Sequence, residues 1–152
     1  MDKYSFQYCQ KIVVFSKDKK KVLLCKRVKE EDYNATFSFI GGKMETSDES
    51  ILEGLRREKN EEVGINFKIK ISLKYTHNVL FQKKDGNSMV LPHYLAIHES
   101  GEIELGEEYS EFKWVEIDNL PEFEPKIPDI DLMVALMNEL DNVNEESDFN
   151  LI

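Results

Sequence analysis

The sequence predicts an α+β fold, in which a mixed sheet and two principal helices form separate layers or an α/β/α sandwich. Three observations predict it. Apolar and alternating β-rich runs fill much of the first 117 residues, two segments (47–63 and 129–141) repeat apolar residues at helical spacing, and no internal repeat or linker interrupts them. With 152 residues, of which 41% are hydrophobic, residues 1–152 are expected to form one domain with a genuine core.

The strands of the first half begin with two apolar runs. KIVVFS (11–16) and VLLCKR (22–27) flank the polar KDKKK and predict a hairpin. Ahead of them, aromatic residues alternate with polar ones as on a half-buried strand, which predicts an edge strand containing Tyr4, Phe6 and Tyr8. The short run FSFIGG then leads to the first helix.

The later strands follow the same logic. FKIKISLKYT (67–76) alternates, and the runs NVLFQ and SMVLPHYLAIH flank the turn signal KKDGN. Pro92 predicts an edge position or a bulge, because proline cannot donate to a strand ladder. EFKWVEI (111–117) predicts one more strand.

The second helix is expected at about 129–141. Its apolar side is predicted to contain Leu132, Met133, Leu136, Met137 and Leu140. The tail at 142–152, NVNEESDFNLI, is acidic and is expected to fray.

The net charge of −10 limits the partners of this chain. A binder of duplex DNA or of an anionic membrane needs a basic footprint, so neither partner is expected. Cys9 and Cys25 lie in strand-like runs without CxxC spacing, which favours ordinary buried residues over a zinc site or a disulfide. The sequence has no apolar run of membrane-span length and no signal-peptide pattern, so a cytoplasmic protein is expected.

The first helix carries the most informative pattern. Thr46 with Glu49 fits a capping box and Gly64 fits a C-terminal stop, so the helix is expected at roughly 47–63. Its apolar stripe begins at Ile51 and Leu55. At helical spacing, positions 51, 55, 58 and 62 share a sector of roughly 60°. The stripe therefore continues onto two glutamates, Glu58 and Glu62. A solvated acidic face would instead lie on the opposite side of the helix.

Three acidic residues crowd the C-terminal end of this helix: Glu58, Glu61 and Glu62. Their mutual repulsion costs a few tenths of a kcal/mol per pair, and the helix dipole adds up to about 1 kcal/mol. Arg57 offsets part of this repulsion. A divalent cation would offset much more, because hard cations prefer carboxylate oxygens, and Mg²⁺ can also bind the phosphate groups of a substrate.

The stretch from Gly42 to Ile65 resembles the Nudix box, G-x5-E-x7-R-E-U-x-E-E-x-G-U, in which U is a bulky aliphatic residue. The matching positions are Glu49, Arg57, Glu58, Glu61, Glu62, Gly64 and Ile65. Six residues lie between Gly42 and Glu49, where the pattern has five, which makes the loop one residue longer than the pattern. Lys59 occupies the first aliphatic position, where its stem is expected to cover apolar surface while the ammonium reaches water.

The resemblance implies a Nudix-type α/β/α sandwich with a central mixed sheet. It also implies Mg²⁺, or Mn²⁺, held by Glu58, Glu61, Glu62 and Gly42. Arg57 would orient these carboxylates, and Glu49 would support them or add a ligand. The catalytic set would be Glu58, Arg57, Glu61 and Glu108. The general base is Glu58 or an acid of the later loop, where Glu107, Glu108 and Glu111 remain alternatives.

Substrate contacts are expected from five residues: Arg27, Gly41, Gly42, Lys43 and Phe81. The glycines permit close backbone approach, and the cations suit phosphate. For Lys43 a solvent-exposed role is nearly as favoured, and Phe81 suits either base stacking or strand packing.

The resemblance implies hydrolysis of a nucleoside diphosphate linked to another group. The small size favours a nucleoside triphosphate pyrophosphohydrolase. Hydrolysis of ADP-ribose, a nucleotide sugar or a dinucleoside polyphosphate is the alternative, and a non-catalytic nucleotide sensor is the alternative of another class. The expected partner is a small nucleotide. A homodimer through the N-terminal strand stays open.

Overall fold

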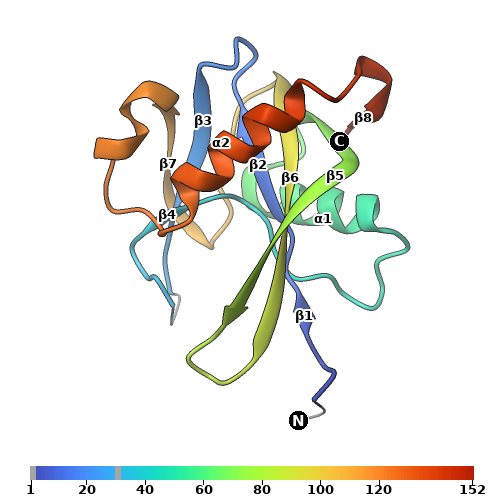
Figure 1. Cartoon of the computed structure of the whole chain (residues 1–152), viewed down its shortest axis with the longest axis vertical. Helices are drawn as coiled ribbons and strands as arrows, with labels where there is room; N and C mark the ends of the chain where they lie inside the picture. The colour runs from blue at the N-terminus through green and yellow to red at the C-terminus, as the bar shows by residue number, and fades with distance from the viewer. Residues whose placement is uncertain (1–2, 30–31) are drawn as a thin grey trace.

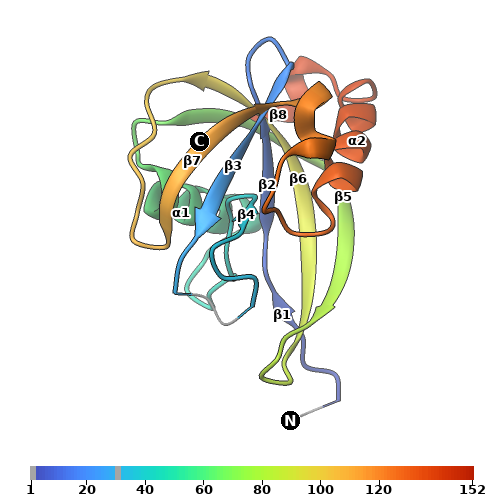
Figure 2. The ribbon, with the colours of Figure 1, turned by 90° about the vertical axis from the view of Figure 1, so that its left-hand side faces the viewer.

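The computed structural model describes residues 3–29 and 32–152. Within these residues, eight strands form one mixed sheet between helix α1 (Ile51–Val63) and helix α2 (Ile130–Asp141). Figure 1 shows α2 crossing in front of the sheet with α1 behind it, and Figure 2, turned by 90°, shows the sheet between the two helices. The predicted α+β class with α/β/α layers is confirmed.

The sheet combines short strands with one long hairpin. Its strands are β1 (Gln7–Tyr8), β2 (Lys11–Phe15), β3 (Lys21–Arg27), β4 (Phe37–Ser38), β5 (Lys68–Gln82), β6 (Ser88–Ser100), β7 (Tyr109–Glu116) and β8 (Phe149–Leu151). Their order is β4-β3-β2-β6-β5-β8, with β1 added to β6 and β7 added to β3. The β5–β6 hairpin extends beyond the body of the molecule in Figure 1. Short 3-10 helices follow β7 (η1, Ile117–Glu122) and precede β8 (η2, Glu146–Asp148).

Both predicted hairpins form. β2 and β3 are antiparallel, and the KKDGN turn closes β5 and β6, with Lys83 N–H donating to the Asn87 carbonyl at 2.9 Å. The N-terminal strand is shorter than predicted. It covers two residues, and the side chains of Tyr4 and Phe6 are exposed instead of half-buried.

Of the two alternatives for Pro92, the edge position is wrong, because β6 lies inside the sheet. A bulge or irregularity does lie next to it, since the β5–β6 register shifts between Ser72 and His77, and His77 pairs with His93. On one side Pro92 pairs with Asn78 of β5. On the other side it falls between the partner strands, since β1 pairs with residues 89–90 and β2 pairs with residues 93–97. A proline is tolerated at such an interruption of the strand ladder, because it has no N–H to donate.

Two clusters of buried side chains fill the spaces between the layers. β2 contributes to both, because alternate residues of a strand face opposite sides. The α1 side of the sheet includes Ile12, Val14, Leu55 and Val63, and the α2 side includes Val13, Phe15, Met133 and Met137. Leu132 was predicted on the apolar side of α2, but it is 57% exposed. Cys9 and Cys25 are buried and free, as predicted.

The expectation of a frayed tail at 142–152 is wrong. β8 pairs with β5, and the backbone of Ile152 forms two hydrogen bonds with Ile69 at 2.9 and 3.0 Å. The Ile152 side chain is buried against the α1-side cluster. Because the tail is mostly acidic, the sequence analysis did not identify Ile152 as a residue that packs in the core. None of the helices in the described ranges has the length and apolar character needed to cross a bilayer.

One buried histidine of β6 makes the stability of the fold depend on pH. His93 is 2% exposed, and its Nδ1 lies 2.9 Å from the carbonyl oxygen of Leu91. Burial lowers its pKa from the usual 6.5 to about 4. The unfolded chain therefore binds a proton that the folded chain does not bind between these two values, and falling pH favours unfolding.

We expect the free energy of unfolding to fall, from pH 7 to pH 4, by up to about 3 kcal/mol more in the wild type than in His93→Gln. Urea unfolding of both proteins at the two pH values measures this difference. Equal losses in the two proteins would show that His93 does not titrate in this way.

Candidate active site

A cavity of about 890 Å³ opens where the C-terminal half of α1 meets one end of the sheet. Its wall combines carboxylates and cations. The carboxylates include Glu58, Glu61, Glu107 and Glu108, and the cations include Lys11, Arg27, Lys43 and Arg57. Such a mixture suits an anionic ligand that is met by cations on one side and by acidic groups on the other.

The helix that carries these acids begins later than the sequence predicted. Ser50 is its N-cap, and the Ser50 hydroxyl accepts a hydrogen bond from Glu53 N–H at 3.1 Å. The proposed capping box of Thr46 and Glu49 is wrong. Thr46 belongs to a turn in which Asp48 N–H donates to the Glu45 carbonyl at 3.0 Å, and Glu49 follows this turn. This turn folds back toward the middle of α1.

The turn places Asp48 next to Arg57. Arg57 Nε and Nη2 donate to the two carboxylate oxygens of Asp48 at 2.8 and 2.9 Å. This bidentate contact from Arg57 lowers the pKa of Asp48 to about 2. Asp48 stands six residues after Gly42, which is the spacing of the first acid of the box. The extra residue therefore lies between the acid and the arginine, and Glu49, the predicted supporting residue, is exposed and outside the cavity wall.

Arg57 also fixes the first predicted ligand, Glu58. Its Nη1 donates to Glu58 Oε1 at 2.7 Å. Glu58 Oε2 lies against Gly42, so close that a Cβ on Gly42 would be 2.1 Å from it. Burial raises the pKa of Glu58, although the Arg57 contact opposes the shift. Gly42 therefore provides the space that the carboxylate occupies.

Glu62 is the most deeply buried acid of the site. It is 1% exposed, and its Oε1 accepts a hydrogen bond from Gly41 N–H at 2.5 Å. Gly41 has φ +137°, and a Cβ there would lie 2.0 Å from the Gln10 carbonyl oxygen, so glycine is required. Burial raises the pKa of Glu62 well above its usual value, and Lys11 opposes the shift. Its Oε2 is buried and has no hydrogen-bond partner among the described residues.

The loop before β7 closes the C-terminal end of α1. Glu104 N–H donates to the Val63 carbonyl and Gly106 N–H donates to the Glu62 carbonyl, both at 2.9 Å. These bonds satisfy carbonyls that a helix end leaves unpaired. They bring Glu108 beside Glu58 and Glu62, where its charge raises the pKa of both carboxyls.

Glu111, an alternative base from the sequence, does not line the cavity. It lies in β7 at 3.8 Å from Lys26 Nζ. The loop preceding β7 therefore supplies Glu107 and Glu108 to the cavity wall, and the strand itself directs Glu111 elsewhere.

Gly106 is expected to be essential for the closure by this loop. A Cβ at Gly106 would lie 2.2 Å from the Glu61 carbonyl oxygen, so Gly106→Ala must displace the loop from the helix. We expect Gly106→Ala to destabilise the protein by about 1–3 kcal/mol, as for other loss of buried hydrogen bonds. Glu102→Ala is the control, because Glu102 is an exposed residue of the same loop and does not line the cavity. Urea unfolding of both variants measures the difference, and equal stabilities would contradict this account.

Lys59 departs from the expectation that its ammonium reaches water. The residue is fully buried, and Nζ donates to the carbonyl of Phe67 at 2.8 Å and to that of Gly64 at 3.3 Å. Burial lowers its pKa to about 8. Lys59 therefore acts as an internal cap for the chain that leaves α1, and it accounts for the absence of an aliphatic residue at this position.

The predicted substrate residues Arg27, Lys43 and Phe81 all line the cavity. Lys43 is exposed at the rim and Phe81 is half-buried. Gly42 is on the wall too, but its carbonyl accepts a hydrogen bond from Gln10 N–H at 2.9 Å. One acceptor position of the predicted metal ligand is therefore already used.

The residues of the wall that the sequence analysis missed include Lys11, Asp32, Tyr33 and Asp129. They come from β2, from the segment between β3 and β4, and from the start of α2, and no local pattern links these segments. Only the isolated lysine in the apolar run of β2 could have signalled a functional position.

The carboxylates of this site have the right chemistry to bind a divalent cation, but their present positions do not form a ready-made metal site. In the described part of the chain, no group of three or more histidine, cysteine or acidic residues is arranged to hold a metal ion. Glu62 Oε2 nevertheless has no hydrogen-bond partner among the described residues, and burial raises the pKa of Glu58 despite its contact with Arg57. A further positive charge near these carboxylates would stabilise their ionised forms. Glu61, 54% exposed at its side chain, lies on the same wall. A hard cation fits this set of donors.

Comparison with known proteins decides the family. The family model of the NUDIX domain matches residues 9–136. The chain belongs to the Nudix family. No curated relative matches it at the sequence level.

Solved Nudix structures share the fold. A MutT protein from Methanosarcina mazei Go1 is 17% identical with a TM-score of 0.72, covering 93% of this chain and 99% of that chain. An Ap4A hydrolase from C. elegans, solved as a binary complex, is 15% identical with a TM-score of 0.72, covering 91% and 99%. The NUDIX domain of Shewanella oneidensis NrtR, complexed with ADP ribose, is 19% identical with a TM-score of 0.67, covering 91% and 88%. At identities below 20%, TM-scores of 0.67 to 0.72 show a common fold.

Proposed function

We propose that this Nudix protein is a metal-dependent nucleoside triphosphate pyrophosphohydrolase, which releases a nucleoside monophosphate and pyrophosphate. The observation that carries the proposal is one cavity whose wall combines the buried Glu58 and the exposed Glu61 of α1 with several cations and two aromatic rings. Pyrophosphatase chemistry is general in the family, whereas the nucleotide is specific to each member. A cavity of about 890 Å³ is within the range of small-ligand sites.

The acidic side of the cavity would hold the cation. Glu58, Glu61 and Glu62 offer carboxylate oxygens from α1, Glu108 offers another from the loop, and Gly42 offers the remaining lone pair of its carbonyl. A bound Mg²⁺ or Mn²⁺ would neutralise phosphate charge and make water more acidic.

Each protein group has a separate role in the proposed reaction. Arg27, Lys11 and Lys43 bind phosphate oxygens. Glu58 accepts a proton from the attacking water through Oε2, because Arg57 holds its other oxygen. The water oxygen forms a bond to phosphorus, and the bridging P–O bond breaks with its electron pair leaving on pyrophosphate. Glu108 is the alternative base.

A panel of nucleotides with Mg²⁺ or Mn²⁺ tests this function. Nucleoside triphosphates, ADP-ribose, nucleotide sugars and dinucleoside polyphosphates are incubated with the protein, and the products are identified by chromatography. We expect a monophosphate and pyrophosphate from a triphosphate. Turnover of only the other classes would replace the substrate, and tight nucleotide binding without turnover would support a sensor.

Metal binding has a test that does not depend on turnover. Glu61→Gln combined with Glu62→Gln removes two crowded charges, so we expect a higher melting temperature of the metal-free protein. The same change removes two ligands, so the stabilisation that Mg²⁺ gives to the wild type should be lost. An unchanged response to Mg²⁺ in the double variant would contradict the assignment of these ligands.

A further inference from the structure

One buried carboxylate of the cavity has no part in the proposed chemistry. Asp32 is 6% exposed and comes from the segment between β3 and β4. Its Oδ1 accepts a hydrogen bond from Lys84 N–H at 3.4 Å, which links it to the β5–β6 hairpin. Its Oδ2 is buried without a hydrogen-bond partner among the described residues. A carboxylate oxygen left in this state is costly unless a ligand supplies a donor.

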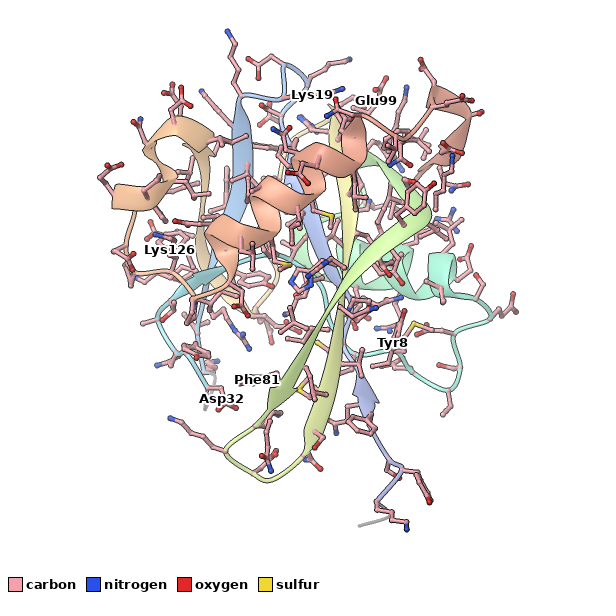
Figure 3. All side chains as sticks on the ribbon, viewed as in Figure 1. Tyr8, Lys19, Asp32, Phe81, Glu99 and Lys126 are labelled. Carbon is pink, nitrogen blue, oxygen red and sulfur yellow. The ribbon has the colours of Figure 1, made fainter. Side chains whose placement is uncertain are left out.

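Two aromatic rings stand next to this carboxylate. Tyr33 follows Asp32 in the chain, and Phe81 of β5 faces Tyr33 with ring centroids 6.2 Å apart and planes inclined by 36°. In Figure 3, Asp32 and Phe81 lie close together where the β3–β4 segment approaches the hairpin. All three residues line the same cavity as the glutamates of α1. Aromatic faces bind any nucleobase, whereas a buried polar group selects among bases.

We infer that Asp32 is a base-selecting residue that favours guanine. An ionised carboxylate only accepts hydrogen bonds. Guanine is the base whose pairing edge presents two adjacent donors, N1–H and the 2-amino group. Adenine and cytosine each place an acceptor beside their amino group, and uracil places carbonyl oxygens on both sides of its single N–H. These acceptors would face the carboxylate oxygens and repel them.

The geometry of the cavity supports this orientation of the nucleotide. The base would lie between the β3–β4 segment and the hairpin, and the phosphates would extend toward Lys11 and Arg27 and then toward α1. The inference rests on the proposed function for its substrate class, but base recognition itself can be measured without catalysis.

Binding of GMP and IMP by calorimetry isolates the contact, because IMP lacks only the 2-amino group. We expect the wild type to bind GMP about ten- to a hundredfold more tightly than IMP, as for hydrogen bonds to a charged group. Asp32→Asn should reduce this ratio to within about threefold. The asparagine oxygen can still accept from Lys84 N–H, so the segment keeps its contact with the hairpin.

Two control variants separate base selection from general effects. Asp118→Asn removes the same charge from an exposed residue outside the cavity wall and should leave the GMP to IMP ratio unchanged. Tyr33→Leu should weaken both nucleotides alike, because stacking does not read the 2-amino group. Circular dichroism checks that each variant is folded.

The outcomes separate this inference from the proposed function. Equal affinities for GMP and IMP in the wild type would overturn the role of Asp32 even if triphosphates are hydrolysed. A ratio that persists in Asp32→Asn would overturn it too. A ratio that collapses in Asp32→Asn, in a protein that hydrolyses no nucleotide, would support base selection and reject the enzyme.

Discussion

Glu58→Gln is expected to lower kcat for a triphosphate substrate by about 10²–10⁴-fold, the usual contribution of a general base. The amide keeps the shape of the side chain and can still accept the hydrogen bond from Arg57 Nη1. It cannot accept a proton from water at neutral pH. The loss should therefore appear in kcat, with little change in nucleotide affinity measured without metal.

Glu53→Gln is the matched control for this change. Glu53 lies in the first turn of the same helix, is exposed, and pairs with Arg56 instead of lining the cavity. Its variant should keep the wild-type kcat. A Glu58→Gln protein that retained more than about a tenth of the wild-type kcat would exclude Glu58 as base. Glu108→Gln would then be the variant expected to lose activity.

The sequence could predict which acids are buried, because one helical stripe continued from Leu55 onto Glu58 and Glu62. Both are indeed buried, at 7% and 1% exposure. Helical spacing also places Glu61 outside this stripe, and the Glu61 side chain is 54% exposed. Local periodicity was sufficient here because the helix is regular and only one of its faces can meet the sheet.

Contacts between segments that are distant in the sequence, or that depend on how a loop folds, explain what the sequence could not predict. Asp48 and Glu49 are adjacent acids, and only the hydrogen-bonded turn at 45–48 decides which of them reaches Arg57. The carbonyls that surround Lys59 belong to the chain beyond the helix. Asp32 meets the hairpin from a distant segment. Each contact depends on tertiary packing that no spacing rule encodes.

Arg57→Ala is expected to destabilise the protein by about 2–4 kcal/mol, since it leaves buried acids without their counter-charge. Asp48 and Glu58 have side chains only 4% and 9% exposed, and both lose the guanidinium that now binds them. The Arg57 side chain is itself 23% exposed, which places the expected loss below that of a fully enclosed pair. The same variant should lose most activity, because Glu58 is no longer held.

The neighbouring residue provides the control for this prediction. Arg56 has the same side chain, lies one position earlier in α1, and pairs with Glu53 at the surface. Arg56→Ala should cost less than about 1 kcal/mol, as exposed ion pairs do. Urea unfolding and kcat for both variants give the comparison. Similar losses in the two would mean that α1 only needs positive charge near its acids, and the bidentate contact with Asp48 would then have no special role.

Arg57→Lys distinguishes charge from geometry. Lysine restores the positive charge but cannot bind both oxygens of Asp48 and also reach Glu58, because its ammonium is a single point donor. We therefore expect Arg57→Lys to recover part of the stability and little of the activity. Full recovery of both would show that the orientation of Glu58 does not depend on the guanidinium, and the role of Arg57 would reduce to neutralising the acidic half of α1.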